Sequence, residues 1–188
     1  MPLNYALEAA RYDETRGGDQ RAAAAAEAVD TLLPHSGILL DVAGGTGIVS
    51  RQMSQRGHQV VVTDLVVEML RPAQRRLPRA AIAMDAGNLA LADSSVDAVT
   101  MIWFLHLVAD SRPVVAEVAR VLKPGGRLVT TVDKHAANGV SEECPTDARS
   151  VVVGVVESLG LHLAGETTFV GVGQPHDPVY PLLAFTRS

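Results

Sequence analysis

Short apolar runs alternate with helix-like segments along most of the chain. Consecutive apolar residues are typical of strands buried on both faces of a parallel sheet. They predict five strands, at residues 37–42, 59–63, 80–84, 96–103 and 127–132. Between the strands, the pattern predicts helices at residues 48–56, 66–76 and 112–122, and an alanine-rich helix precedes them at residues 19–33. This alternation predicts an α/β fold, a doubly wound, Rossmann-like sheet.

The C-terminal third departs from that alternation. A helix is predicted at residues 147–159, and two strand-like runs follow at residues 167–172 and 182–186. The segment between these runs, GQPHDPVYP, has the composition of a hairpin connection. Because consecutive strands without a helix between them cannot be parallel neighbours, we expect an antiparallel edge. Residues 133–147 are expected to form a loop.

Length and composition indicate one domain. The chain has 188 residues, of which 47% are hydrophobic and 20% charged, so it can bury a core of its own. We expect residues 1–34 to form an N-terminal helical cap and residues 35–188 a Rossmann-like core. A single cysteine, Cys144, excludes an internal disulfide and a metal-thiolate cluster, and no metal site is predicted.

Charge and hydropathy disfavour two classes of partner, nucleic acids and membranes. The net charge of −5 does not favour nucleic acid. Four arginines without interleaved aromatic residues are interpreted as a solvated helix face: Arg71, Arg75, Arg76 and Arg79. The N-terminal segment lacks the pattern of a secretion signal, and the longest mostly apolar stretch, residues 98–109, is too short to cross a bilayer. We therefore expect a cytoplasmic protein with neither nucleic-acid nor membrane partners.

The strongest chemical signal is the segment ILLDVAGGTGIVS, residues 38–50. It begins as a strand, turns through Gly44, Gly45 and Gly47, and ends as a helix whose free N–H groups face the turn. Such glycines occur with nicotinamide and with S-adenosylmethionine cofactors. Asp41 at the strand end would repel a pyrophosphate but suits the ammonium group of an amino-acid moiety. The alternative is that Asp41 only caps the turn.

Two further acids follow the next two strands. Asp64, 19 residues after Gly45, is placed to accept hydrogen bonds from a ribose diol, or else to cap the following helix. Asp85 could accept from an adenine amino group, or could simply mark an ordinary strand exit. All three acids fall on the carboxyl edge, where open α/β sheets hold ligands. Together they indicate a nucleoside without phosphate.

Over residues 12–131 the chain resembles the class I S-adenosylmethionine-dependent methyltransferases, particularly the small-molecule branch of ubiquinone and menaquinone biosynthesis. The resemblance is carried by DVAGGTG, TDLVVEML, MDAGNLAL, SSVDAVTMIWFLHLVAD and EVARVLKPGGRL, in that order. The family usually has glycine where this chain has Ala43. The resemblance implies a seven-stranded sheet whose last strand is antiparallel, with S-adenosylmethionine as cofactor and a small molecule as methyl acceptor.

The resemblance also assigns residues. Asp41 and the backbone of Ala43, Gly44, Gly45 and Gly47 would hold the methionine portion. Asp64 would bind ribose, Leu65 and Met69 would lie beside the adenosine, Asp85 and Ala86 would flank the adenine, and Trp103 would lie near the sulfonium. The segment 123–126, KPGG, is interpreted as a structural turn from helix into the fifth strand.

The acceptor site is less defined. His106 and His135 are candidate general bases and His176 a weaker one, although a lone histidine beside an apolar run is more often a packing residue. Tyr12 and Arg16, with Tyr5, could close over the cofactor or acceptor, unless the tyrosines only pack helices. The pocket is either small, open, or completed by a second copy of the chain.

Two other functions are considered for this sequence. One is a cofactor-binding module without methyl transfer, and the other is a nicotinamide oxidoreductase, which Asp41 and the segment VLKPGG disfavour.

Overall fold

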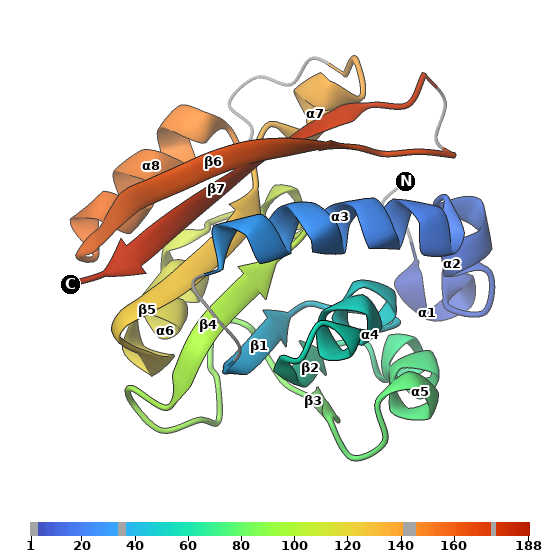
Figure 1. Ribbon diagram of the computed structural model, residues 1–188, viewed down its shortest axis with the longest axis horizontal. Helices are drawn as coiled ribbons and strands as arrows, with labels where there is room; N and C mark the ends of the chain where they lie inside the picture. Colours follow the sequence, from blue (N-terminus) through green and yellow to red (C-terminus); the bar gives the residue numbers. More distant parts are fainter. Residues whose placement is uncertain (1–3, 34–36, 141–145, 174–175) are drawn as a thin grey trace.

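The computed structural model describes residues 4–33, 37–140, 146–173 and 176–188. Its centre is a seven-stranded sheet in the order β3-β2-β1-β4-β5-β7-β6 (Figure 1). The strands are β1 (Ile38–Val42), β2 (Gln59–Asp64), β3 (Ala81–Ala83), β4 (Val96–Met101), β5 (Leu122–Thr131), β6 (Leu161–Val170) and β7 (Val179–Arg187). Neighbours are parallel except that β7 is antiparallel to both β5 and β6. The predicted fold class is confirmed.

Helices cover both faces of this sheet. They are α1 (Tyr5–Glu8), α2 (Tyr12–Thr15), α3 (Gly18–Leu32), α4 (Ile48–Gln55), α5 (Val67–Arg76), α6 (Arg112–Val121), α7 (Lys134–Ala137) and α8 (Arg149–Ser158). One apolar cluster packs α3, α4 and α5 on one face, and a second packs α6 and α8 on the other (Figure 1). The apolar runs of β1 and β4 are buried because both faces are covered.

Several predicted elements are corrected. The strand predicted to reach residue 103 ends at Met101, and Trp103 follows in a turn at a φ of 56°. The expected loop 133–147 begins with the short helix α7. The final strands are longer than predicted, and β7 lies inside the sheet so that β6 forms the edge. The segment 123–126 does turn the chain, but as a bulge inside β5, since Leu122 pairs with Val96 and Arg127 with Ala98.

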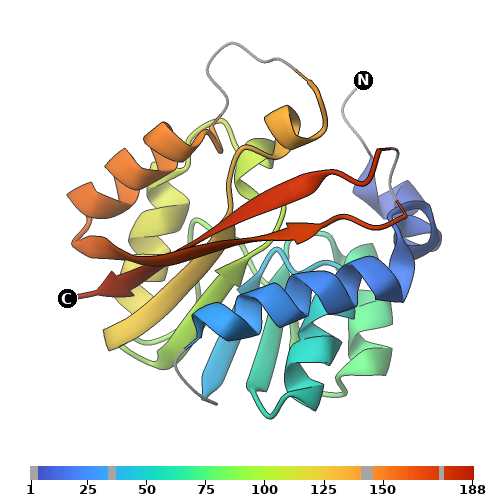
Figure 2. The same cartoon turned by 45° about the horizontal axis from the view of Figure 1, so that its top comes forward.

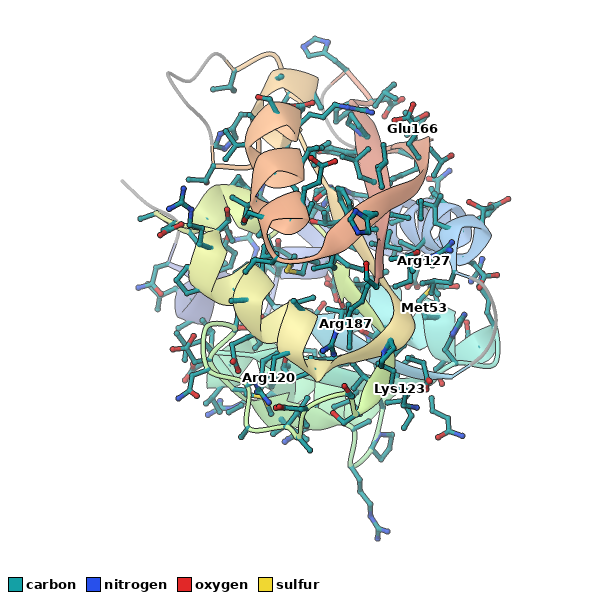
Figure 3. All side chains as sticks on the ribbon, turned by 90° about the vertical axis from the view of Figure 1, so that its left-hand side faces the viewer. Met53, Arg120, Lys123, Arg127, Glu166 and Arg187 are labelled. Carbon is teal, nitrogen blue, oxygen red and sulfur yellow. The ribbon has the colours of Figure 1, made fainter. Side chains whose placement is uncertain are left out.

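Basic side chains hold together the end of the sheet where the parallel strands begin. Lys123 pairs with Asp97 at 2.7 Å, and Arg127 donates to the carbonyl of Leu32 at 2.7 Å. Figure 3 labels these two residues together with Arg120 and Arg187, whose guanidinium groups bind backbone carbonyls nearby. Because these cations are engaged with protein carbonyls and carboxylates, this end of the sheet is structural.

The hairpin of β6 and β7 reaches the N-terminal helices at the opposite end (Figure 2). Gly17 has a φ of 86°, and a Cβ there would lie 2.3 Å from the carbonyl oxygen of Val172. Only glycine permits this approach, which brings α2 and α3 beside the hairpin. Among the described residues, each helix is too short or too polar to span a lipid bilayer.

Candidate functional site

The glycine loop joins β1 to α4 at the carboxyl edge of the sheet. Its backbone takes positive φ at Ala43 (55°), Gly45 (56°) and Gly47 (68°). Gly44 donates its N–H to the carbonyl of Thr63 at 2.9 Å, which ties the loop to β2. A Cβ at Gly44 would lie 2.5 Å from a carboxylate oxygen of Asp41, so this position requires glycine.

Ala43 is the one residue of this loop that pays a conformational cost, since an L-residue in the left-handed region is disfavoured by about 1–2 kcal/mol. We expect Ala43→Gly to raise the free energy of unfolding by about 1 kcal/mol, measured by urea denaturation. The matched control is Ala23→Gly within α3, where glycine should instead lower stability. A loss of stability in Ala43→Gly would show that the alanine methyl group contributes more by packing than it costs by strain.

Asp41 is buried behind the glycine loop, with 3% of its surface exposed. Its carboxylate accepts hydrogen bonds from the hydroxyl of Thr100 at 2.8 Å and from that of Ser50. Burial raises the pKa of Asp41 to about 6, although both hydroxyl groups favour the charged form. Near neutral pH, Asp41 is therefore a carboxylate held in a poorly solvated place, which attracts a cation.

Asp64 ends β2 and faces the same loop. One carboxylate oxygen accepts from the backbone N–H of Gly45 at 3.0 Å and the other from that of Val66 at 2.8 Å. Burial raises its pKa, against the effect of these hydrogen bonds. A carboxylate has about four acceptor sites, so each oxygen can accept a further bond from a ligand. The bond to Val66 also caps the turn into α5, so the ligand and capping interpretations are compatible.

A cavity of about 360 Å³ opens in front of these groups and is called the large cavity below. Ten of the predicted cofactor residues line it: Asp41, Ala43, Gly44, Gly45, Asp64, Leu65, Met69, Asp85, Ala86 and Trp103. Gly47 does not line it. A Cβ there would lie 3.0 Å from that of Ala73, so Gly47 instead permits α4 to approach α5.

Sequence reasoning missed how the N-terminal segment is attached. Asp13 accepts hydrogen bonds from the hydroxyl of Thr46 and from the guanidinium of Arg76, both at 2.6 Å. Arg76 also donates to the carbonyl of Thr46 at 2.7 Å. Arg76 was predicted to be part of a solvated face, which is wrong: it ties α2 and α5 to the glycine loop. This network places the rings of Tyr5 and Tyr12, 5.9 Å apart, in the wall of the large cavity.

A second cavity of about 190 Å³ adjoins the first and is called the small cavity below. Tyr5, Tyr12, Trp103 and Leu107 line both cavities. The small cavity is otherwise lined by basic residues and histidines: Arg16, Arg21, His106, Lys134 and His135. The structure thus brings together the candidates Arg16, His106 and His135. His176 does not line either cavity and is exposed on the hairpin.

His106 has an unusual environment for a general base. Its Nε2 lies 2.9 Å from the Nζ of Lys134, and a lysine ammonium can only donate, so Nε2 accepts. Burial, then the charge of Lys134, then His135 lower the pKa of His106 to about 3. The ring is therefore neutral near pH 7, with its proton on Nδ1.

We expect the His106 imidazole to show no titration between pH 5 and 9 in two-dimensional NMR spectra, with the signal assigned by its loss in His106→Asn. Unfolding returns the pKa toward 6.5, so the unfolded chain binds more protons. The contribution of His106 to stability is thus complete above about pH 6.5 and declines as the pH falls. In Lys134→Met the pH midpoint of the His106 imidazole titration should move upward, because the nearby positive charge is gone. A midpoint near 6.5 in the wild-type protein would contradict this environment.

Known proteins resemble this chain in both sequence and fold. Residues 40–130 match the family model described as a methyltransferase domain. A demethylmenaquinone methyltransferase of Renibacterium salmoninarum is 42% identical over 102 residues. These matches support a class I S-adenosylmethionine-dependent methyltransferase with quinone-biosynthesis-like relatives.

Two solved structures show the same fold. An S-adenosylmethionine-dependent methyltransferase of Thermotoga maritima superposes with a TM-score of 0.78 at 18% identity, over 98% of both chains. A protein solved in complex with the Haloferax volcanii methyltransferase activator Trm112 has a TM-score of 0.77 at 16% identity, over 100% of both chains. The match to the Renibacterium enzyme covers 54% of this chain and 43% of that enzyme. The chain thus spans about two fifths of its curated relative.

Proposed function

We propose that this protein transfers the methyl group of S-adenosylmethionine to an oxygen, nitrogen or carbon atom of a small molecule. One observation carries the proposal. Three carboxylates, Asp41, Asp64 and Asp85, line the large cavity, and no Lys or Arg of the described residues lines it with them. Such a cavity suits a nucleoside that carries positive charge on a sulfonium and an ammonium, and it disfavours a pyrophosphate.

The proposed contacts follow the places of these side chains. Asp64 would bind the ribose hydroxyls, and Asp85, which is exposed and accepts the N–H of Gly87 at 2.8 Å, would face the adenine with Ala86. Leu65 and Met69 would contact the adenosine. Asp41 and the loop backbone would hold the methionine portion, and the sulfonium would then lie toward Trp103, which lines both cavities.

Methyl transfer from a sulfonium is an in-line displacement. The acceptor atom attacks the methyl carbon while the C–S bond breaks and its electron pair goes to sulfur. Alignment of the acceptor, methyl and sulfur can supply on the order of 7–11 kcal/mol of the barrier reduction. We propose that the small cavity provides this alignment, with Tyr12 and Arg16 in its wall.

A base is required only when the acceptor atom carries a proton. His106 and His135 are the proposed candidates, and their rings lie 5.2 Å apart in the small cavity. His106 would first have to release its bond from Lys134. An acceptor that arrives as an anion needs no base.

The alternative function is a cofactor-binding module of the same fold without methyl transfer. Calorimetry with S-adenosylhomocysteine tests cofactor binding, and detection of S-adenosylhomocysteine formed from S-adenosylmethionine across a panel of phenols, amines and carboxylic acids tests turnover. Binding with turnover supports the proposal. Binding without turnover across the panel favours the alternative, and a thermal-shift response to NAD(P) alone would reject both.

Two further expectations stay predictions. A second copy of the chain is the proposed protein partner, and light scattering coupled to size-exclusion chromatography measures whether it associates. The cytoplasmic location expected from the sequence is tested by fractionating cells that express the tagged protein.

A further inference from the structure

Arg21 is a buried cation without a carboxylate partner. Only 6% of its surface is exposed, and no Asp or Glu pairs with it in the part of the chain that the structure describes. Its pKa is lowered, first by burial and also by the neighbouring Arg16, while the hydroxyl groups of Tyr180 and Tyr12 act in the opposite direction. A buried charge is costly unless it is paired, so this position calls for an anion.

The guanidinium is fixed in orientation but is not saturated with hydrogen bonds. Its Cζ lies 3.6 Å from the centre of the Trp103 ring, and its nitrogens donate to the carbonyl of Arg16 at 3.1 Å and to the hydroxyl of Tyr180 at 3.5 Å. Its Nε is buried and has no hydrogen-bond partner. Since a guanidinium has five N–H donors in a planar fork, donors remain for a planar oxyanion.

The small cavity that Arg21 lines has the complementary chemistry. Arg16 and Lys134 add positive charge, and Tyr5, Tyr12 and Trp103 add aromatic walls. No carboxylate of the described residues lines it. The ammonium group of the cofactor's methionine end would find no carboxylate among the described residues there, whereas the large cavity offers Asp41.

We propose that the small cavity binds the carboxylate group of the methyl acceptor, with Arg21 as the recognition residue, so that the substrate class is small organic acids with an aromatic or apolar body. That this acid is the methyl acceptor rests on the proposed function, whereas the binding site itself does not. A volume of about 190 Å³ holds about six water molecules, which limits the enclosed part of the acid to a single small ring.

The test uses the protein saturated with S-adenosylhomocysteine and a pair of probes of equal shape, benzoate and the uncharged benzamide. We expect calorimetry to show benzoate binding at least about 10-fold more tightly than benzamide. Arg21→Met should abolish this preference. Arg75→Met, an exposed arginine on α5 that lines neither cavity, should leave it unchanged.

Stability separates recognition from a structural role. If Arg21 serves a ligand, removing its unpaired buried charge should leave the melting temperature unchanged or raise it. Arg21→Gln is the second variant should methionine prevent folding. A large fall in melting temperature in both variants, with the preference for benzoate retained in a folded one, would overturn the proposal.

Two cofactor analogues test whether Arg21 binds the carboxylate of the acceptor or that of the cofactor. S-adenosylhomocysteine carries the amino-acid carboxylate, and 5′-methylthioadenosine lacks it. Equal affinities of wild type and Arg21→Met for both analogues support an acceptor site. A selective loss of S-adenosylhomocysteine affinity would overturn it, because Arg21 would then hold the cofactor. If S-adenosylhomocysteine does not bind the wild-type protein at all, the proposed function fails, whereas binding without a preference for benzoate refutes only this inference.

Discussion

Replacing Asp64 with alanine is expected to weaken the binding of S-adenosylhomocysteine by roughly 10- to 150-fold, because charge-assisted hydrogen bonds contribute about 1.5–3 kcal/mol. The two carboxylate oxygens already accept the N–H groups of Gly45 and Val66, so the side chain is held in place before a ligand arrives. Such preorganisation lets the ribose hydroxyls bind without ordering the acid. Isothermal titration calorimetry measures the change directly.

Asp97→Ala is the matched control for this prediction. Asp97 also accepts a backbone N–H, that of Ile38 at 2.9 Å, and it pairs with Lys123, but at the opposite end of the sheet. It should lose stability with no change in cofactor affinity. Were Asp64→Ala to behave like this control, Asp64 would be only the cap of the turn into α5.

Asp41→Asn is expected to stabilise the protein at pH 8 while weakening its affinity for the cofactor. Burial raises the pKa of Asp41 from its usual 3.8 to about 6. Ionised Asp41 therefore costs stability above pH 6, and at about 1.4 kcal/mol per pKa unit its removal should contribute about 1–3 kcal/mol. Asparagine can still bond both Ser50 and Thr100, because each hydroxyl group can donate or accept.

The pH dependence of this gain follows from the sign of the shift. Between pH 4 and 6 the folded chain binds more protons at Asp41 than the unfolded chain. The stability of the wild-type protein therefore falls as the pH rises through this range. The advantage of Asp41→Asn should thus be full above pH 6 and vanish near pH 4, measured by urea unfolding across this range. A gain that does not vary with pH would argue against a buried charge.

The loss of cofactor affinity in Asp41→Asn distinguishes two roles of this acid. If Asp41 attracts the ammonium group of the methionine portion, affinity for S-adenosylhomocysteine should fall while that for 5′-methylthioadenosine, which lacks this group, stays constant. Equal affinities of the variant and the wild-type protein for both compounds would leave Asp41 with the capping role alone.

Local signals were sufficient for the sheet and for the edge that holds the large cavity. The runs around Leu39 and Val99 are apolar at consecutive positions because helices cover both faces, and that pattern is readable without the fold. Parallel strands bring their carboxyl ends to one edge, so Asp41, Asp64 and Asp85 were expected to meet there. They do line one cavity.

No comparable sequence pattern predicted the residues that line the small cavity. Arg21 stands in an alanine-rich helix and reads as an exposed cation of an amphipathic segment, yet it is buried against Trp103 from another part of the chain. Arg76 likewise reads as one of four solvated arginines until Asp13 and Thr46 are placed beside it. Trp103 was expected near the cofactor, but its position in the wall between the large cavity and the basic small cavity was not.

Local sequence patterns were enough to predict the succession of strands and helices along the chain, the tight glycine turn and the acids at the strand ends, because each of these depends on neighbours within a few positions of the chain. Which arginines are buried and which are paired with an acid became clear only from the folded chain. Burial and pairing depend on the packing of α2, α3 and the β6–β7 hairpin over the sheet, and no local pattern encodes those distances. For this reason the proposed cofactor site was readable in the sequence, whereas the proposed acceptor site was not.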